Sequence, residues 1–100
     1  MKVNELIDYI SDNNFYSLNS VYENIKGQVN QVAKGMNLDE RRWYSTAIDV
    51  YECEDGYVGV FGVYQIFSEQ MEYEDVDVKC YAEEYAAVPR ITYIPKYEAN

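Results

Sequence analysis

Apolar residues near the start of the chain recur with the period of a helix. Those from Val3 to Ile10 are spaced i, i+3, i+4 and i+7, which places them along one stripe of a helix. The polar run at residues 11–14 ends this pattern. We therefore predict a first helix at about residues 3–11.

A second helical pattern follows after a short polar interval. Ser20 and Glu23 have the spacing of a capping box, in which the serine oxygen accepts the Glu23 amide while the Glu23 carboxylate reaches back. Ser17 is an alternative cap one turn earlier. Apolar residues keep helical spacing as far as Met36, and Gly35 supplies the left-handed residue that commonly ends a helix. These signals predict a second helix at about residues 20–34.

Between residues 43 and 67 the chain becomes rich in β-branched and aromatic residues, which predicts a β-hairpin. A two-residue turn at Asp55-Gly56 would pair Glu54 with Tyr57. Both faces of such a hairpin are partly apolar, and two helices can cover only one of them. We expect the face left open to be rich in tyrosine and to carry Tyr51, Val58, Val60 and Tyr64.

The last part of the chain alternates apolar and polar residues, which predicts a strand at about residues 76–84 and a short edge strand at about 90–94 before Pro95. A chain of 100 residues falls in the size range of one domain. The predicted fold class is therefore α+β, a single domain at residues 1–100. In it, two N-terminal helices pack on a three- to four-stranded, mainly antiparallel sheet.

Charge is distributed very unevenly along the chain. The formal net charge is −10, from 18 acidic and 8 basic side chains. The stretch from Asp49 to Glu84 holds eleven acidic side chains and one basic side chain, Lys79, and so accounts for the whole imbalance. Direct binding of nucleic acid or of an anionic membrane requires lysines and arginines facing phosphates, so the charge argues against both as partners.

Residue types needed for common catalytic and metal sites are missing. The sequence has no histidine, two cysteines and no glycine-rich phosphate loop at the start of a helix. The acidic run 69–77 offers oxygen ligands for calcium but lacks the glycine and the spacing of an EF-hand loop, so we expect a solvated loop. We predict that the chain is not an enzyme and has no cofactor and no metal site.

Cysteine usage and the absence of a targeting segment predict the compartment. Small secreted domains that depend on disulfide bonds usually have more than two cysteines, so we expect both cysteines to be reduced. The chain starts without the profile of a signal peptide and has no apolar run of the ~20 residues that span a bilayer. The predicted localisation is the cytoplasm.

The acidic stretch suggests mimicry of nucleic acid. Alternate residues on one face of a strand lie ~6.7 Å apart, close to two rises of ~3.4 Å along a DNA strand. If extended, Glu52 with Glu54, Glu72 with Glu74, and Asp75 with Asp77 would each present two carboxylates at that interval. Tyrosines beside such carboxylates could stack on the arginines of a phosphate-binding groove, although many tyrosines simply fill half-buried sheet positions. The hypothesis requires the carboxylates to gather on one surface. The predicted partner-binding residues are Asp49, Glu52, Glu54, Asp55, Glu69, Glu72, Glu74, Asp75, Asp77, Tyr51, Tyr64 and Tyr73.

Three stretches carry a resemblance to a group of proteins. Residues 38–44 (LDERRWY), 57–60 (YVGV) and 88–93 (VPRITY) resemble small acidic proteins of bacteriophages and mobile elements of low-GC Gram-positive bacteria. The resemblance covers roughly residues 38–96 and transfers no catalytic residue. It implies a host-cell context in which such proteins often inhibit host defence or DNA-handling machinery, as anti-CRISPR and antirestriction proteins do.

Two functions from different classes follow. The first is an inhibitor that mimics nucleic acid and blocks a basic groove on a nucleic-acid-binding host protein. The alternative is a homo-oligomeric structural or adaptor protein, in which the open apolar face forms a symmetric interface, for example in a homodimer.

Overall fold

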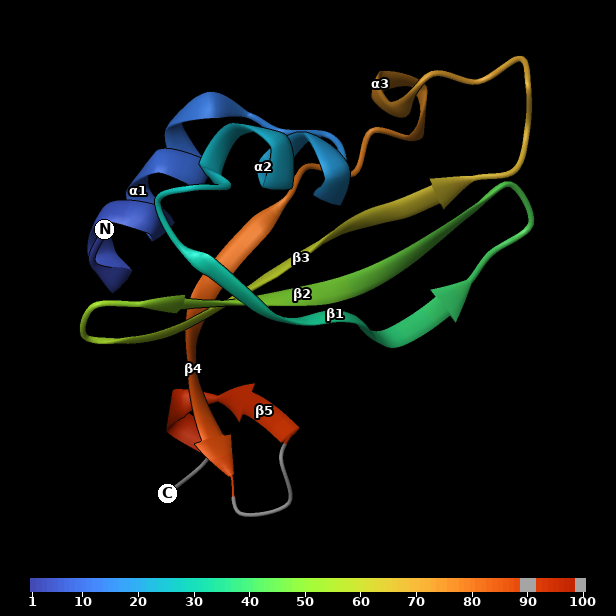
Figure 1. The fold of residues 1–100 in the computed structure, drawn as a ribbon. Coiled ribbons are helices and arrows are strands. Elements are labelled where there is room, and N and C mark those ends of the chain that lie inside the picture. Colours follow the sequence, from blue (N-terminus) through green and yellow to red (C-terminus); the bar gives the residue numbers. More distant parts are fainter. Residues whose placement is uncertain (89–91, 99–100) are drawn as a thin grey trace.

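Two N-terminal helices lie across one face of a curled antiparallel sheet, with a third short helix beyond them (Figure 1). The structure is a computed structural model and describes residues 1–88 and 92–98. The α+β class and the two N-terminal helices agree with the sequence analysis. The elements are α1 (Val3–Asn13), α2 (Leu18–Ile25), β1 (Asn30–Glu40), β2 (Tyr44–Cys53), β3 (Gly56–Ile66), α3 (Tyr73–Val76), β4 (Tyr81–Val88), β5 (Thr92–Pro95) and a 3-10 turn, η1 (Lys96–Glu98).

Helix α1 begins where the apolar stripe begins. The N–H of Val3 donates to Asp55 Oδ1 at 2.8 Å, and the N–H of Lys2 donates to Glu5 Oε1 at 3.0 Å. These bonds satisfy amides that a helix start leaves without intrahelical partners. Asn14 then takes a left-handed conformation and ends the helix. The predicted first helix is confirmed, and it extends two residues further than expected.

Helix α2 uses the alternative cap and is much shorter than predicted. Ser17 Oγ accepts the N–H of Ser20 at 3.0 Å, and the helix ends at Ile25, ahead of Gly27 with its positive φ. The prediction of helix to residue 34 is wrong, because residues 30–40 form strand β1, which pairs with β2. Pairing with a neighbouring strand outweighs a helical apolar spacing that glycines already weaken.

The sheet has the order β1-β2-β3-β4-β5, with every neighbouring pair antiparallel. The sequence analysis predicted three or four strands, and the strand that it did not predict is β1. The β2–β3 hairpin is confirmed, but Cys53 rather than Glu54 closes the turn by pairing with Gly56. From Thr46 to Cys53 this register differs by two residues from the predicted one, so these side chains stay on their expected face. A register shift between Ser45 and Thr46 breaks this agreement at the far end of the hairpin.

The C-terminal strands lie later in the chain than predicted. Strand β4 starts at Tyr81 instead of residue 76, because residues 73–76 form α3. Strand β5 covers Thr92–Pro95, and the predicted start of that strand, residues 90 and 91, lies outside the described residues. Of the helices in the described ranges, none combines the length and hydrophobicity that a membrane span requires.

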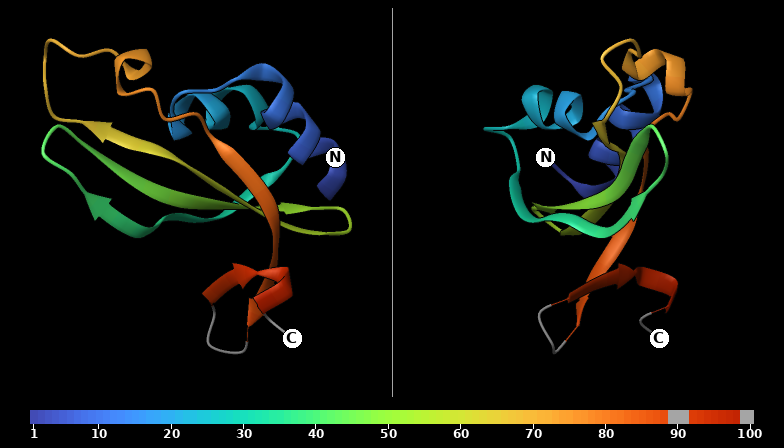
Figure 2. Two further views of the ribbon diagram at one scale, coloured as in Figure 1. Left: turned by 180° about the vertical axis from the view of Figure 1, so that it is seen from behind. Right: turned by 90° about the vertical axis from the view of Figure 1, so that its right-hand side faces the viewer.

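The helices cover the sheet face that was expected to stay open. Tyr51, Val58 and Val60 are each at most 1% exposed and pack with α1 and α2 in one apolar cluster. Figure 2 shows the helices on one side of the sheet and the β4–β5 hairpin reaching down on the other. The prediction that these residues form a free surface is therefore wrong.

The opposite, outer face is only partly filled. A side chain at Gly59 would collide with the ring of Tyr85, so this ring covers the outer face at that point. Further along, Phe61 pairs with Tyr81 across β3 and β4, and their side chains are 39% and 61% exposed. The exposed apolar surface of the sheet is thus the side that carries Phe61.

Both cysteines are free and buried, which predicts low thiol reactivity. Burial raises the pKa of Cys53 to about 11 and that of Cys80 to about 12. At pH 8 only about one Cys53 thiol in a thousand is then a thiolate, the reactive form. We expect an aromatic disulfide reagent at pH 8 to react slowly with the folded protein and rapidly in guanidinium. Rapid release of two equivalents from the folded protein would contradict this.

Candidate protein-binding surface

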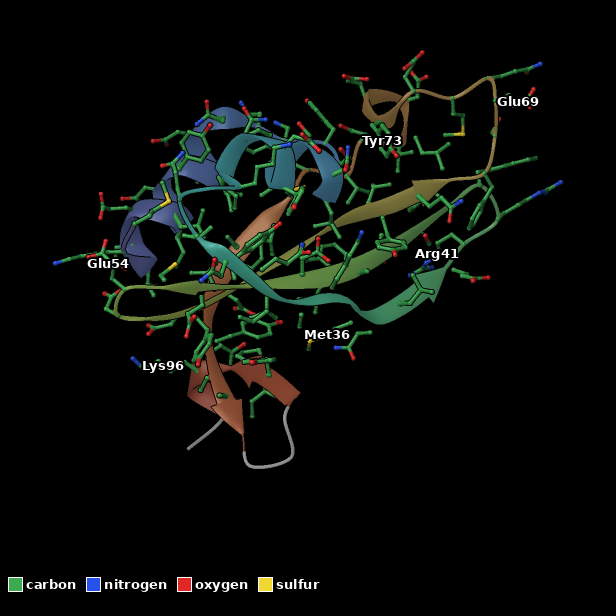
Figure 3. All side chains as sticks on the ribbon, in the orientation of Figure 1. Met36, Arg41, Glu54, Glu69, Tyr73 and Lys96 are labelled. Atoms are coloured by element: carbon green, nitrogen blue, oxygen red, sulfur yellow. The ribbon has the colours of Figure 1, made fainter. Side chains whose placement is uncertain are left out.

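The predicted acidic residues lie at two ends of the molecule. Glu54 sits at the β2–β3 turn, whereas Glu69 lies in the loop beyond the far end of β3 (Figure 3). We name the first group the hairpin tip (Glu52, Glu54 and Asp55). We name the second group the acidic segment (Glu69, Glu72, Glu74, Asp75 and Asp77). The requirement that all these carboxylates share one surface is therefore not met, and that part of the mimicry hypothesis is wrong.

The hairpin tip is occupied by the N-terminal region. The Met1 ammonium donates to Glu54 Oε2 at 2.8 Å, and Asp55 Oδ1 accepts the first amide of α1. The hydrogen bond from the ammonium lowers the pKa of Glu54, and the same bond raises the pKa of the amino terminus. These two carboxylates stabilise the start of α1, so we do not place them in a partner-binding surface.

The acidic segment folds around the short helix α3. Asp75 Oδ2 accepts the N–H of Glu72 at 2.9 Å, and Asp77 follows the helix in a left-handed conformation. The segment is not an extended strand, so the predicted phosphate-like spacing of Glu72 with Glu74 and of Asp75 with Asp77 is wrong. A helical turn satisfies its own amides, which a lone extended segment cannot do.

The carboxylates of the acidic segment are nevertheless free to meet a partner. All five residues are exposed. Within the described residues, the ion pairs join Glu54, Glu23, Asp39 and Glu84 to cations, and none of them includes a residue of the acidic segment. No lysine or arginine occurs between residues 68 and 78. This stretch therefore presents concentrated negative charge that no ion pair of the described residues neutralises, although Arg41 and Arg42 lie at the same end of the sheet, where the N–H of Phe67 donates to the carbonyl of Trp43 (Figure 3).

A recess opens next to the acidic segment on the helix side of the sheet. Its volume is about 510 Å³, within the range of ligand pockets. It is formed by α2, the first three strands and α3, and Tyr73 of α3 belongs to both the recess and the acidic segment's helix. The residues that line it are Leu18, Asn19, Tyr22, Gln31, Lys34, Asp49, Tyr64, Gln65 and Tyr73.

Asp49 provides a buried carboxylate in the wall of this recess. Its side chain is on β2 and the residue is 2% exposed. Oδ1 accepts the N–H of Gly35 at 2.9 Å, and Oδ2 accepts Nε2 of Gln31 at 3.3 Å. Burial raises the pKa of Asp49, while the Gly35 hydrogen bond and the charge of Lys34 oppose that rise.

The structure sorts the predicted tyrosines into two groups. Tyr64 and Tyr73 line the recess together, as does Tyr22, which the sequence analysis did not select. Tyr51 is 1% exposed and its hydroxyl accepts a hydrogen bond from Gln31 at 3.2 Å. Burial raises its pKa. The prediction that Tyr51 contacts a partner from the surface is wrong, because the helices cover it.

The sequence analysis missed Gln31 and Lys34 because it assigned them to a helix. The signal that could have found them is the pair Gly27 and Gly35, which makes a helix across this stretch costly. Asp49 was selected for its charge alone and does not belong to an exposed acidic surface. Its position opposite Gly35 depends on the pairing of β1 with β2.

Comparison with known proteins adds no relative. No protein-family model, curated protein or solved structure matches this chain. The resemblance to small phage and mobile-element proteins therefore stays a prediction. Among the described residues, no group of three or more cysteine or acidic side chains is arranged to hold a metal ion.

Proposed function

We propose that the chain is a small, non-enzymatic acidic domain that binds a basic protein surface through the acidic segment. The observation that supports this proposal is the set of five exposed carboxylates that no described lysine or arginine pairs with. Such a set repels itself, apart from the hydrogen bond by which Asp75 holds the start of α3, and a cationic partner relieves the repulsion. Complementary charge of this kind speeds association and selects partners.

The partner we propose is a nucleic-acid-binding protein of the host cell, with the chain acting as its inhibitor. A groove that binds phosphates already presents arginines and lysines at high density. Carboxylates grouped around α3 can occupy such a groove by charge alone, without matching the spacing of a DNA strand. This proposal keeps the phage or mobile-element inhibitor as the biological role, and the hairpin tip takes no part in it.

Capture followed by competition tests the proposal. The immobilised chain is incubated with a nuclease-treated lysate of a low-GC Gram-positive bacterium, and bound proteins are eluted with salt. We expect a basic protein whose binding to a labelled DNA duplex, followed by fluorescence anisotropy, falls as free chain is added. Screening explains the salt elution, because the Debye length shrinks from ~10 Å at 0.1 M to ~3 Å at 1 M. If no captured basic protein loses nucleic-acid binding, the proposal is wrong.

A second candidate function is self-association through the outer face of the sheet. The exposed pair Phe61 and Tyr81 supports it, since exposed apolar patches often mark interfaces. If this function holds, sedimentation velocity will show a dimer that dissociates on dilution, and the double variant Phe61→Ser, Tyr81→Ser will be monomeric at every concentration. A wild-type chain that stays monomeric at high concentration would exclude this candidate.

A further inference from the structure

The recess beside the acidic segment combines features that suit one kind of side chain. It has a buried carboxylate, three tyrosines from three separate elements and enough volume for a long side chain. We propose that the recess binds an arginine side chain of the partner protein, with its guanidinium on Asp49 and among Tyr22, Tyr64 and Tyr73. The inference rests on the proposed function for the basic nature of the partner.

Asp49 has acceptor capacity left for such a group. An ionised carboxylate offers about four lone-pair sites on its two oxygens, and each oxygen of Asp49 receives one hydrogen bond. Both donors are neutral, and the ion pairs of the described residues do not include Asp49. A buried carboxylate without a cation bears a desolvation cost that an incoming cation offsets.

Guanidinium fits this recess better than ammonium does. Its planar fork donates two parallel hydrogen bonds to one carboxylate, and its flat face stacks on aromatic rings. Cations also bind favourably over tyrosine rings, more so when water is excluded. Lysine offers a compact, strongly hydrated charge that gains less from three ring faces.

Lys34 competes with the proposed arginine, because it is a cation of the chain itself that lies near Asp49. It lines the recess and its charge opposes the rise in the Asp49 pKa, so the lysine lies within electrostatic range of the carboxylate. Yet it is exposed and forms no ion pair with Asp49. Removal of this charge therefore leaves Asp49 more strongly attractive to an external cation.

The test uses N-acetyl-arginine methylamide as the probe and the folded chain labelled with ¹⁵N. The matched control ligand is N-acetyl-citrulline methylamide, which has a closely similar shape and no charge. We expect saturable shifts of the Gly35 amide and the Gln31 side-chain amide, which both bond to Asp49. Citrulline should bind roughly ten- to a hundredfold more weakly, since hydrogen bonds to charged groups contribute such factors. The lysine analogue should bind more weakly than arginine.

Two variants with opposite effects separate a binding role from a structural one. Asp49→Asn should weaken arginine binding at least tenfold, while Asp12→Asn on the exposed side of α1 should leave it unchanged. Lys34→Gln should tighten arginine binding, whereas Lys2→Gln, a lysine outside the recess with the same charge change, should have a smaller effect. Tighter binding cannot result from damage to the fold, so Lys34→Gln remains informative even if Asp49→Asn folds poorly.

Each result separates this inference from the proposed function. If arginine and citrulline bind equally, or if Lys34→Gln does not tighten binding, the recess is no arginine site. If Asp49→Asn binds the captured partner as the wild type does while reversal of the acidic segment abolishes binding, the inference fails and the proposed function stands. If the recess binds arginine but reversal of the segment leaves partner binding intact, the proposed function fails instead.

Discussion

The double variant Glu69→Lys, Glu74→Lys is expected to bind the captured basic partner about 100-fold more weakly than the wild type. Each reversal removes an attraction and adds a repulsion, and an exposed charge contact contributes up to about 1 kcal/mol. Two reversals therefore cost about 3 kcal/mol, or about 100-fold in affinity. Both residues are exposed, and neither supplies the Asp75 side chain that bonds the start of α3.

A matched control carries the same change in charge at another place. Asp8→Lys, Glu52→Lys alters two exposed carboxylates, one on α1 and one at the hairpin tip, that form no ion pair within the described residues. It should weaken binding only slightly, and both variants should keep the wild-type circular dichroism spectrum. Equal losses in the two variants would show that net charge, and not the acidic segment, governs binding. Unchanged binding in the segment variant would contradict the assignment directly.

Leu6→Ala is expected to lower the free energy of unfolding by about 2–5 kcal/mol, the range for removing a large buried aliphatic side chain. Leu6 is 0% exposed and belongs to the cluster between the helices and the sheet. Total stability of a domain this size is about 5–15 kcal/mol, so this one change removes a large part of it. Urea denaturation followed by circular dichroism measures the loss.

The control for this variant is Asn4→Ala, an exposed residue on the same helix. It should change stability by less than about 0.5 kcal/mol. A loss below 1 kcal/mol for Leu6→Ala would mean that α1 does not cover the sheet as described. The covered face carries Tyr51, so that result would also reopen the possibility that the tyrosine-bearing side is free.

The sequence predicts those parts of this fold whose pattern and end signals lie close together in the chain. Helix α1 and the β2–β3 hairpin have regular periodicity and clear end signals, and both were predicted. Strand β1 was not, because Val29 and Val32 also suit a helical stripe and because three register shifts interrupt its pairing with β2. Such bulges break the two-residue alternation by which a strand is recognised.

The sequence predicted some of the residues of the candidate site but not their arrangement in space. Charge counting selected the acidic segment, and tyrosine enrichment selected Tyr64 and Tyr73. Their arrangement around Asp49 depends on α2, three strands and α3 meeting at one end of the sheet, which no local pattern encodes. Long-range contacts also bring the amino terminus to Glu54, so its carboxylate is occupied within the chain and is not assigned to the partner-binding surface.

Hydrogen exchange of backbone amides, followed by mass spectrometry with and without the captured basic protein, tests the location of the contact most directly. Slower exchange at residues 68–79 and 18–22 in the complex, with no change at 52–56, is the predicted result. Protection confined to the hairpin tip, or to the outer face around Phe61 and Tyr81, would contradict the assignment of the acidic segment as the binding surface.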